Sequence, residues 1–202
     1  MSGKLYRNEE AHDRVRSASI VKVAIAAHHL KSPRSSAQYS TIRVMITQSD
    51  NTAAYTLFDS VGPQVIRDLS RWDTRAIYSP WWGHTLVTAA GQAKYLSALA
   101  DGKVLPKQGT RMLLGLMRHA EPEQRWGLAE GVQGKGRSSV PVKNGWYAWE
   151  DLGTTSINCL ALLPFDGDSE RLAVAVTTSY ASDRGLGYGR TTCRLIGEAL
   201  AE

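Results

Sequence analysis

The sequence is poor in cysteine and has no long apolar run, and both shortages limit what the chain can be. Its two cysteines, Cys159 and Cys193, give no zinc-type spacing and no Cys-x-x-Cys motif. They either form one disulfide bond in an oxidising compartment or stay as two buried thiols. No segment is apolar enough to cross a membrane, and residues 1–18 are too polar and charged for a signal peptide. We therefore expect no metal site, no cofactor and no membrane span within this chain.

The chain also lacks a dense run of basic residues. It carries 24 Lys and Arg against 19 Asp and Glu, a formal net charge of +5, but the two signs are interspersed along the sequence. Nucleic-acid-binding proteins usually gather their positive charge on one face or one helix, so we expect no nucleic-acid partner. The 202 residues, 43% of them hydrophobic, are enough for one sizeable core. We predict a single domain over residues 1–202, and the sequence leaves its oligomeric state open.

The apolar pattern changes along the chain from helical to strand-like. Residues 19–31 are apolar, rich in Ala and free of Gly and Pro, which predicts a buried helix. The aromatic segment 73–87 is irregular, and the GLGYG sequence at 185–189 is interpreted as a turn before a last helix. The remaining predictions are helices at 39–47, 52–61, 63–72, 88–101, 106–119 and roughly 190–201, and strands at 138–146, 154–163 and 171–179.

This order of elements predicts an α+β fold, in which a helical lobe packs on an antiparallel sheet followed by a C-terminal helix. We place the helical lobe at about residues 33–130. The sheet lobe takes about residues 131–202 together with the N-terminal segment.

A Ser-x-x-Lys motif, Ser19 and Lys22, opens the first predicted helix. The spacing places both side chains on one face of the helix, one turn apart. Ser19 lies in the first turn, where free N–H groups and the helix dipole stabilise negative charge. Lys22 is followed by apolar residues, and a desolvated lysine has a lowered pKa and can act as a base toward a serine. A serine at this position is also a common helix cap, so the motif alone does not establish a site.

The triplet Ser49-Asp50-Asn51 follows at the junction between two predicted helices. Asp50 or Asn51 suits the cap of the second helix, which is the simplest interpretation of such a triplet. In a functional site, Ser49 would relay a proton and the amide of Asn51 would bind a substrate amide.

The third motif is Lys143-Asn144-Gly145-Trp146, at the end of a predicted strand. Gly145 lets a ligand approach the backbone closely, and an edge strand can offer N–H groups to a developing oxyanion. Lys143 is suited to hold a carboxylate. The alternative is a strand that simply ends in a turn.

The three motifs occur in one order, on a helix, at a helix junction and on a strand. Ser-x-x-Lys, Ser-Asp-Asn and Lys-[Thr/Ser]-Gly in this order are the signature of class A β-lactamases and penicillin-binding proteins. The chain therefore resembles the penicillin-recognising serine hydrolases, and class A β-lactamases most closely. The stretches SDNTAA and DLGTTSINCLALLP add to the likeness, which runs with gaps from about residue 5 to the C-terminus.

The resemblance implies which groups would carry the chemistry. Ser19 would be the acylated nucleophile, and Lys22 would be its base or proton relay. Ser49 would deliver a proton to the leaving nitrogen. The backbone N–H groups of Ser19 and Trp146 would form the oxyanion hole.

The same resemblance implies the substrate-binding positions. Asn51 would bind the substrate amide, and Lys143, Asn144 and Gly145 would hold the substrate carboxylate and the adjoining part of the substrate, while Asp50 would stay structural. Asn144 departs from the family pattern, because it stands where the family has Thr or Ser. Its amide can still donate a hydrogen bond, but it is longer than a hydroxyl and differently placed.

The chain also departs from the family around the site. The segment between Lys22 and Ser49 is shorter than in the lactamases, which predicts a more open cleft. The glutamate that deacylates class A lactamases has no clear counterpart. Asp73, in the sequence SRWDTR, is the tempting candidate, but it follows the predicted helix 63–72 directly, before the family's omega loop begins. The sequence YSPWWGHTL replaces that loop, and its tryptophans are interpreted as a roof over the core.

A further departure lies at the N-terminus. Only 18 residues precede Ser19, where the family has a helix and two strands that complete the sheet. Either the chain is truncated, or its sheet is smaller and has an exposed edge.

The expected function is that of a serine hydrolase that forms an acyl-enzyme at Ser19, with weak turnover. Its substrate would be a β-lactam or a carboxylate-bearing amide or ester, either a small molecule or peptidoglycan-like. The alternatives are a non-catalytic binding or scaffold protein with the same fold, and a D,D-peptidase or esterase. By resemblance we expect an exported protein, in which a disulfide bond between Cys159 and Cys193 would join the middle strand to the last helix.

Overall fold

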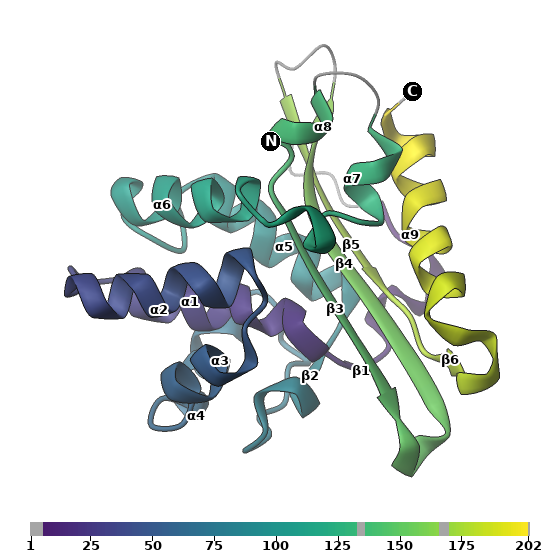
Figure 1. The fold of residues 1–202 in the computed structure, drawn as a ribbon, viewed down its shortest axis with the longest axis horizontal. Coiled ribbons are helices and arrows are strands. Elements are labelled where there is room, and N and C mark those ends of the chain that lie inside the picture. The colour runs from purple at the N-terminus through teal and green to yellow at the C-terminus, as the bar shows by residue number, and fades with distance from the viewer. Residues whose placement is uncertain (1–5, 133–135, 166–169, 202) are drawn as a thin grey trace.

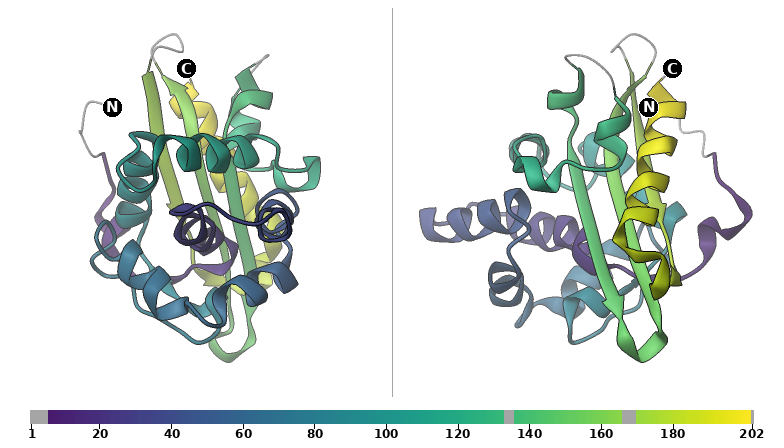
Figure 2. Two further views of the ribbon diagram at one scale, coloured as in Figure 1. Left: turned by 90° about the vertical axis from the view of Figure 1, so that its left-hand side faces the viewer. Right: turned by 45° about the vertical axis from the view of Figure 1, so that its right-hand side comes forward.

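The computed structural model describes residues 6–132, 136–165 and 170–201. Figure 1 shows a layer of helices on one side of an antiparallel sheet and a long helix, α9 (Gly185–Ala201), on the other side. The turned views in Figure 2 show the same succession of layers. The predicted α+β architecture, with a helical lobe, a sheet and a C-terminal helix, is therefore confirmed.

The sheet is an antiparallel meander of β3 (Val142–Trp149), β4 (Thr154–Phe165) and β5 (Glu170–Thr177), in that order. The two-residue strand β6 (Tyr180–Ala181) pairs with the beginning of β4. β4 is therefore the central strand, and its mostly apolar sequence suits burial on both faces. β3 is an edge strand, and its outer edge is paired with no other strand in the described part of the chain.

The helical layer surrounds α1, whose sequence is apolar on nearly every side. It packs against α2, α3, α4 and α6. A helix without a polar face is stable when other elements cover it on all sides. The layer thus begins before the predicted lobe boundary at residue 33. None of the described helices is long and apolar enough to span a membrane. The helices of this layer are α1 (Lys22–Leu30), α2 (Ser36–Thr47), α3 (Asn51–Phe58), α4 (Gly62–Leu69), α5 (Ala89–Ala100) and α6 (Lys107–Arg118).

Shorter helices fill the connections. The one-turn helices α7 (Leu128–Gly131) and α8 (Gly136–Ser139) precede β3, so that strand starts later than the predicted residue 138. The 3-10 helices are η1 (Glu9–His12), η2 (Ala18–Val21), η3 (Trp82–His84), η4 (Pro122–Gln124), η5 (Glu150–Leu152) and η6 (Ser182–Arg184).

Polar side chains fix where helices in the layer begin. Asp50 caps α3, because its Oδ1 accepts a hydrogen bond from the Ala53 N–H at 2.6 Å. Thr88 caps α5 in the same way, through the N–H of Gly91 at 3.0 Å. The structural role expected for Asp50 is therefore present, and it fixes the residues on either side of it.

Helix α9 begins earlier than the sequence predicts. The GLGYG sequence at 185–189, interpreted as a turn, forms the first turns of this helix. A Cβ atom at Gly189 would lie 2.6 Å from the Cβ of Ile157 on β4. Glycine therefore permits the close approach of helix and sheet, and this packing outweighs the low helix propensity of the residue.

A disulfide bond joins Cys159 of β4 to Cys193 of α9, with Cα atoms 6.5 Å apart. Both residues are fully buried. Of the two alternatives for the cysteines, the bridge is therefore the one that the fold contains. It ties the C-terminal helix to the central strand of the sheet.

The N-terminal segment contributes a strand, but not to the main sheet. The two-residue strand β1 (Val15–Arg16) pairs with β2 (Leu86–Val87) in a separate antiparallel ladder. No strand in the described part of the chain pairs with the outer edge of β5. Within the described residues the sheet is therefore small and has an unpaired edge at β5, which fits either alternative for the N-terminus.

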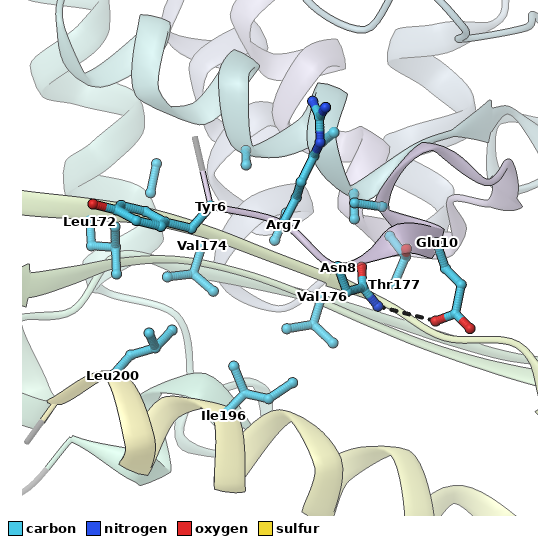
Figure 3. Close-up of a pocket in the computed structure, with 16 residues that line it drawn as sticks. Tyr6, Arg7, Asn8, Glu10, Leu172, Val174, Val176, Thr177, Ile196 and Leu200 are labelled. Atoms are coloured by element: carbon cyan, nitrogen blue, oxygen red, sulfur yellow. Dashed lines mark hydrogen bonds between the residues drawn. The ribbon is translucent and has the colours of Figure 1, made fainter. Parts of the chain in front are cut away.

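A groove of about 380 Å³ runs along this edge of β5. Figure 3 shows Leu172, Val174 and Val176 of β5 on the same side as Ile196 and Leu200 of α9. The groove is therefore mostly apolar. It lies at the β5 edge of the sheet, opposite the edge formed by β3.

Candidate active site

Two residues with unusual backbone conformations mark the candidate site. Among the described non-glycine residues, positive φ angles occur at Ala18 (45°) and Ser49 (60°). Such conformations cost of the order of 1–3 kcal/mol each and gather at functional sites. Ala18 directly precedes Ser19, and Ser49 opens the Ser-Asp-Asn triplet. This signal is absent from the sequence, because neither residue type favours a positive φ.

Ser19 lies in η2, which continues directly into α1. The residue is 8% exposed and lines a cleft. It stands in the first turn of this combined helix, where unpaired N–H groups favour negative charge on a nearby oxygen. Lys22 follows three residues later as the first residue of α1.

Strand β3 approaches Ser19 through Gly145. A Cβ atom at Gly145 would lie 2.5 Å from the backbone N of Ser19 and 2.9 Å from that of Ile20. These neighbours are backbone atoms that cannot easily move, so glycine is required for this contact. Trp146 is the next residue on the same strand, opposite Ile157 of β4. The two predicted oxyanion-hole residues, Ser19 and Trp146, are thus brought to neighbouring segments.

Lys22 is completely buried and is hydrogen bonded to the triplet. Its Nζ donates to the backbone O of Ser49 at 2.6 Å and to Oδ1 of Asn51 at 2.7 Å, and lies 3.4 Å from Ser49 Oγ. The Nζ also stands 4.5 Å from the centre of the Trp82 ring. Burial lowers the pKa of Lys22 to about 7, against the opposing effect of the Asp50 charge. A substantial share of Lys22 is therefore neutral near pH 7 and able to accept a proton.

The hydroxyl of Ser49 connects the two lysines. Lys143 Nζ donates to Ser49 Oγ at 2.8 Å and to the backbone O of Asn144 at 2.9 Å. Burial of Lys143 lowers its pKa well below the usual range, and the positive charge of Lys22 lowers that pKa further. A lysine ammonium can only donate, so Ser49 Oγ accepts from it, and the hydrogen of Ser49 is left for another acceptor.

Asn51 is exposed at the same cleft. Its Oδ1 accepts from Lys22, which fixes the orientation of the amide. Its Nδ2 makes no hydrogen bond with another described residue. That group is therefore able to donate to a carbonyl oxygen.

Asn144 differs from the expectation that it helps to bind substrate. Its Nδ2 donates to the backbone O of Gln124 at 2.9 Å and to that of Trp126 at 2.9 Å. The residue is 1% exposed and is not part of the cleft lining. The amide that replaces the family's hydroxyl instead ties β3 to the loop before α7, because two carbonyl groups there need a donor.

Asp73 is buried at the start of α5, outside the cleft lining. Its Oδ2 accepts from the N–H of Thr88 at 2.8 Å, and its Oδ1 accepts from Thr88 Oγ1 at 3.0 Å. Gln92 Nε2 lies 3.3 Å from Oδ2. The carboxylate thus stabilises the N-terminus of a helix. Asp73 thus lies outside the cleft lining, which agrees with the objection from its position after the 63–72 segment.

A cleft of about 400 Å³ opens beside Ser19 between η2, the start of α3, η3 and β3. No Asp or Glu is among the described residues that line it. Trp82 is buried in the hydrophobic core and Trp81 packs against it, as the sequence predicts, and both residues also line the cleft. The aromatic residues of the lining are Tyr55, Trp81, Trp82, Trp146, Tyr147 and Trp149.

The aromatic residues of β3 are functional candidates that the sequence interpretation missed. Tyr147 and Trp149 are two and four residues beyond Gly145, so they project from the same face of the strand. That alternation is a signal by which they could have been found. Among the described residues, no group of three or more His, Cys, Asp or Glu side chains comes together. The polar side chains that line the cleft carry hydroxyls and amides, and Lys22 and Lys143 are buried behind Ser49.

The fold and the site define a class of protein, that of the β-lactamases and penicillin-binding proteins. The TLA-3 extended-spectrum β-lactamase superposes with a TM-score of 0.78 at 15% identity, over 100% of this chain and 90% of that one. A β-lactamase from Chitinophaga pinensis gives 0.75 at 17% identity, over 94% and 87% of the two chains. A mutant of PBP-A, solved as an acyl-enzyme complex with penicillin G, gives 0.68 at 20% identity, over 95% and 84%.

The particular family follows from the sequence itself. Residues 35–201 match the model of the β-lactamase enzyme family, and the chain belongs to that family. The comparison with curated proteins gives no match. At the family level, the chain is thus a β-lactamase-like serine hydrolase, as the order of the three motifs predicts.

Proposed function

We propose that this protein forms an acyl-enzyme through Ser19 with a β-lactam or a carboxylate-bearing amide or ester. The observation that carries the proposal is the Ser49 hydroxyl, which is held between the buried amino groups of Lys22 and Lys143 next to the start of the Ser19 helix. Two lysines, a bridging hydroxyl and a serine at a helix N-terminus are the parts that acyl transfer to a serine requires.

Acylation begins with the neutral form of Lys22. The lysine takes the proton of Ser19 Oγ while that oxygen forms a bond to the carbonyl carbon of the substrate. The electron pair of the carbonyl moves to its oxygen, and the N–H groups of Ser19 and Trp146 are the donors proposed to stabilise the resulting charge. The lowered pKa of Lys22, about 7, makes this proton transfer effective near neutral pH.

Ser49 then serves the leaving group. The tetrahedral carbonyl re-forms as the bond between the carbon and the leaving nitrogen breaks, and the nitrogen takes the proton of Ser49. Lys22, now an ammonium 3.4 Å from Ser49 Oγ, returns a proton to that oxygen. Lys143 donates to the same oxygen at 2.8 Å and so keeps the Ser49 hydrogen directed away from both lysines.

A substrate that carries a carboxylate fits the charge of this site. Lys22 and Lys143 lie side by side on Ser49, and no described carboxylate lines the cleft to neutralise them. Burial lowers the pKa of both lysines, and a substrate anion nearby would favour their charged forms. The free Nδ2 of Asn51 is placed to bind the substrate amide.

Hydrolysis of the acyl-enzyme is proposed to be slow. Deacylation needs a general base for the attacking water, and the cleft offers no Asp or Glu among the described residues that line it. The hydrogen bonds that Asp73 accepts from Thr88 and Gln92, outside the cleft lining, support this proposal. The natural substrate could therefore be a lactam that stays bound, or a D,D-peptide or ester whose acyl group leaves to another acceptor.

An extracytoplasmic location is part of the proposal. The disulfide bond between Cys159 and Cys193 supports it, because such bonds persist mainly in oxidising compartments. Family membership points the same way, as does the resemblance to enzymes that act on the cell envelope.

Intact-mass analysis after incubation with a penicillin tests the proposal. We expect an adduct equal to the mass of the whole penicillin, because ring opening releases no fragment. The Ser19→Ala variant should give no adduct, whereas Ser40→Ala, an exposed serine on α2, should react like the wild type. An adduct that persists in Ser19→Ala would refute the nucleophile. No adduct with any penicillin or activated ester would favour the non-catalytic binding protein instead.

A further inference from the structure

The cleft carries a compact group of aromatic side chains that the acylation chemistry does not use. Trp81, Tyr147 and Trp149, here called the aromatic wall, are in mutual contact. The ring centres of Tyr147 and Trp149 are 4.4 Å apart, and Trp81 lies 5.5 Å from Tyr147 and 6.3 Å from Trp149. Three aromatic residues from two separate segments thus meet beside the cleft, where Trp149, 1% exposed, lies behind the more accessible Trp81 and Tyr147.

The place of the wall relative to Ser19 follows from strand geometry. Gly145 touches the backbone at Ser19, and side chains two residues apart on a strand share a face. Tyr147 therefore follows at about 7 Å along β3 from Gly145, and Trp149 at about 13 Å. A group attached close to the reacting carbonyl can reach Tyr147 by following the edge strand.

Contacts with neighbouring side chains hold Trp149 of the aromatic wall in place. Trp149 Nε1 donates to Ser156 Oγ at 2.9 Å. The guanidinium of Arg16 stacks on the Trp149 ring at 4.8 Å and is fixed by hydrogen bonds of 2.8 and 2.6 Å to Asp151. Tyr147, in contrast, is 44% exposed. A pre-organised aromatic surface that remains open to solvent loses little entropy when a ligand covers it.

The lining of the cleft also contains polar atoms without partners. Trp81 Nε1, Trp82 Nε1 and Gln124 Oε1 are buried and make no hydrogen bond with the described part of the chain. Buried polar groups are nearly always paired in folded proteins. These atoms are therefore open to hydrogen bonds with water or with a ligand that enters the cleft.

We propose that the acyl part of the substrate carries a flat aromatic substituent that packs against the aromatic wall. The inference rests on the proposed acylation of Ser19 and extends it by naming the substituent that the cleft selects. A cationic substituent would find no counter-charge at the wall, because Arg16 and Asp151 at its far end neutralise each other and no described acid lines the cleft. Aromatic rings stack or meet edge to face at the distances already present in the wall.

Two penicillins that share one nucleus and differ only in a phenylacetyl or an acetyl substituent test this inference. Each aromatic contact favours binding by about 2- to 12-fold, so contact with Tyr147 and Trp81 should make acylation by the phenylacetyl compound about 10- to 100-fold more efficient. Tyr147→Thr should reduce that ratio several-fold. Threonine suits an exposed strand position, so this variant should fold. Tyr188→Ala, an equally exposed tyrosine on α9, should keep the ratio of the wild type.

Binding of both compounds to Ser19→Ala, measured by calorimetry, separates this inference from the acylation itself. If the wild type is not acylated but Ser19→Ala binds the phenylacetyl compound more tightly, the wall stands and the proposed function fails. If both compounds acylate Ser19 at similar rates, or Tyr147→Thr leaves the ratio unchanged, the wall is refuted while the proposed function stands. Absence of both acylation and selective binding refutes both.

Discussion

At the scale of single residues, the site depends on two lysines that the fold deprives of water. Lys22 and Lys143 are 0% and 2% exposed, and burial lowers the pKa of each. Their mutual repulsion lowers the pKa of Lys143 further. A carboxylate partner would reverse these effects, and the cleft lining described here has none. The site is thus arranged so that one amine can be neutral at the pH at which other lysines are charged.

The rate of Ser19 acylation is expected to rise with pH through about 7. Lys22 must lose its proton to act as a base, and its lowered pKa, about 7, sets the midpoint of the rise. Lys22→Arg should slow acylation by about 10²–10⁴-fold, because a guanidinium does not deprotonate. Stopped-flow or quenched-mass measurement of the rate from pH 5 to 9 provides the profile. Lys94→Arg, on the surface of α5, serves as the control, and a rate independent of pH would contradict the role of Lys22.

What the sequence predicts at this scale depends on how local the contact is. Ser19 and Lys22 are one helical turn apart, so their relation follows from helix geometry alone. Asn144 and Asp73 could not be placed in this way. Their partners lie 18 to 20 and 15 to 19 residues away and are reached only after the chain has folded. The positive φ angle of Ser49 is likewise imposed by tertiary contacts.

At the scale of elements, the site is the contact between the edge strand β3 and the helix that begins at η2. Gly145 determines how close the two can come, since a Cβ there would meet two backbone nitrogen atoms. The aromatic residues farther along β3 lie beside the same helix start. A small displacement of this strand would therefore change the oxyanion hole, the lysine pair and the wall together.

Gly145→Ala is expected to impair acylation strongly and to destabilise the fold by about 1–3 kcal/mol. The added methyl group would force β3 away from Ser19 N, and a misplacement of this kind can cost about 10²-fold in rate. Gly115→Ala on α6 is the matched control. A Cβ there meets nothing within 4 Å, so the helix should gain about 0.5–1 kcal/mol. Urea denaturation and acylation rates check both variants, and normal acylation by Gly145→Ala would contradict the close contact.

The disulfide bond between β4 and α9 is expected to stabilise the fold without taking part in the chemistry. Its two cysteines are 34 residues apart in sequence, and closure of such a loop stabilises by about 4 kcal/mol in the chain-entropy account. The double variant Cys159→Ala with Cys193→Ala should lower the free energy of unfolding by about 2–4 kcal/mol. Acylation by the remaining folded protein should be unchanged. Equal urea midpoints for the variant and the wild type would show that the bridge is absent or without effect.

Element boundaries illustrate what sequence patterns can and cannot predict. The apolar helices and the three-stranded meander follow from periodicity, because each buries one face or all of its surface. The start of α9 does not follow from periodicity. Its glycines favour a turn locally, and they are helical here because the helix packs against Ile157 of β4. The boundary of the helical lobe is placed by position in the sequence. Contacts with other helices include α1 in the helical layer, and such contacts are not visible in the sequence.

At the scale of the whole molecule, the candidate site lies at the boundary between the helical layer and the sheet. The helical layer supplies Ser19, Lys22 and the triplet, and β3 supplies Lys143 and the aromatic residues. The loop sequence YSPWWGHTL adds aromatic rings where the resemblance to class A lactamases predicts a glutamate. The proposed acylation would use these groups, and no Asp or Glu among the described residues that line the cleft is available for the deacylation step.

Rapid formation of an acyl-enzyme, followed by its very slow loss, is expected from this arrangement. One equivalent of acyl-enzyme should form per protein, and its loss to water should be slower than in an enzyme with a general base by about 10²–10⁴-fold. Time-resolved mass spectra after removal of free penicillin give the rate of loss. Hydroxylamine, a stronger nucleophile than water, should shorten the lifetime of the adduct because it needs less help from a base. Asp73→Asn should leave that lifetime unchanged, because Asp73 is bound to Thr88 and Gln92 at the start of α5. Steady turnover at the rate of acylation would show instead that a base reaches the ester, and loss of that turnover in Asp73→Asn would return the aspartate to the mechanism.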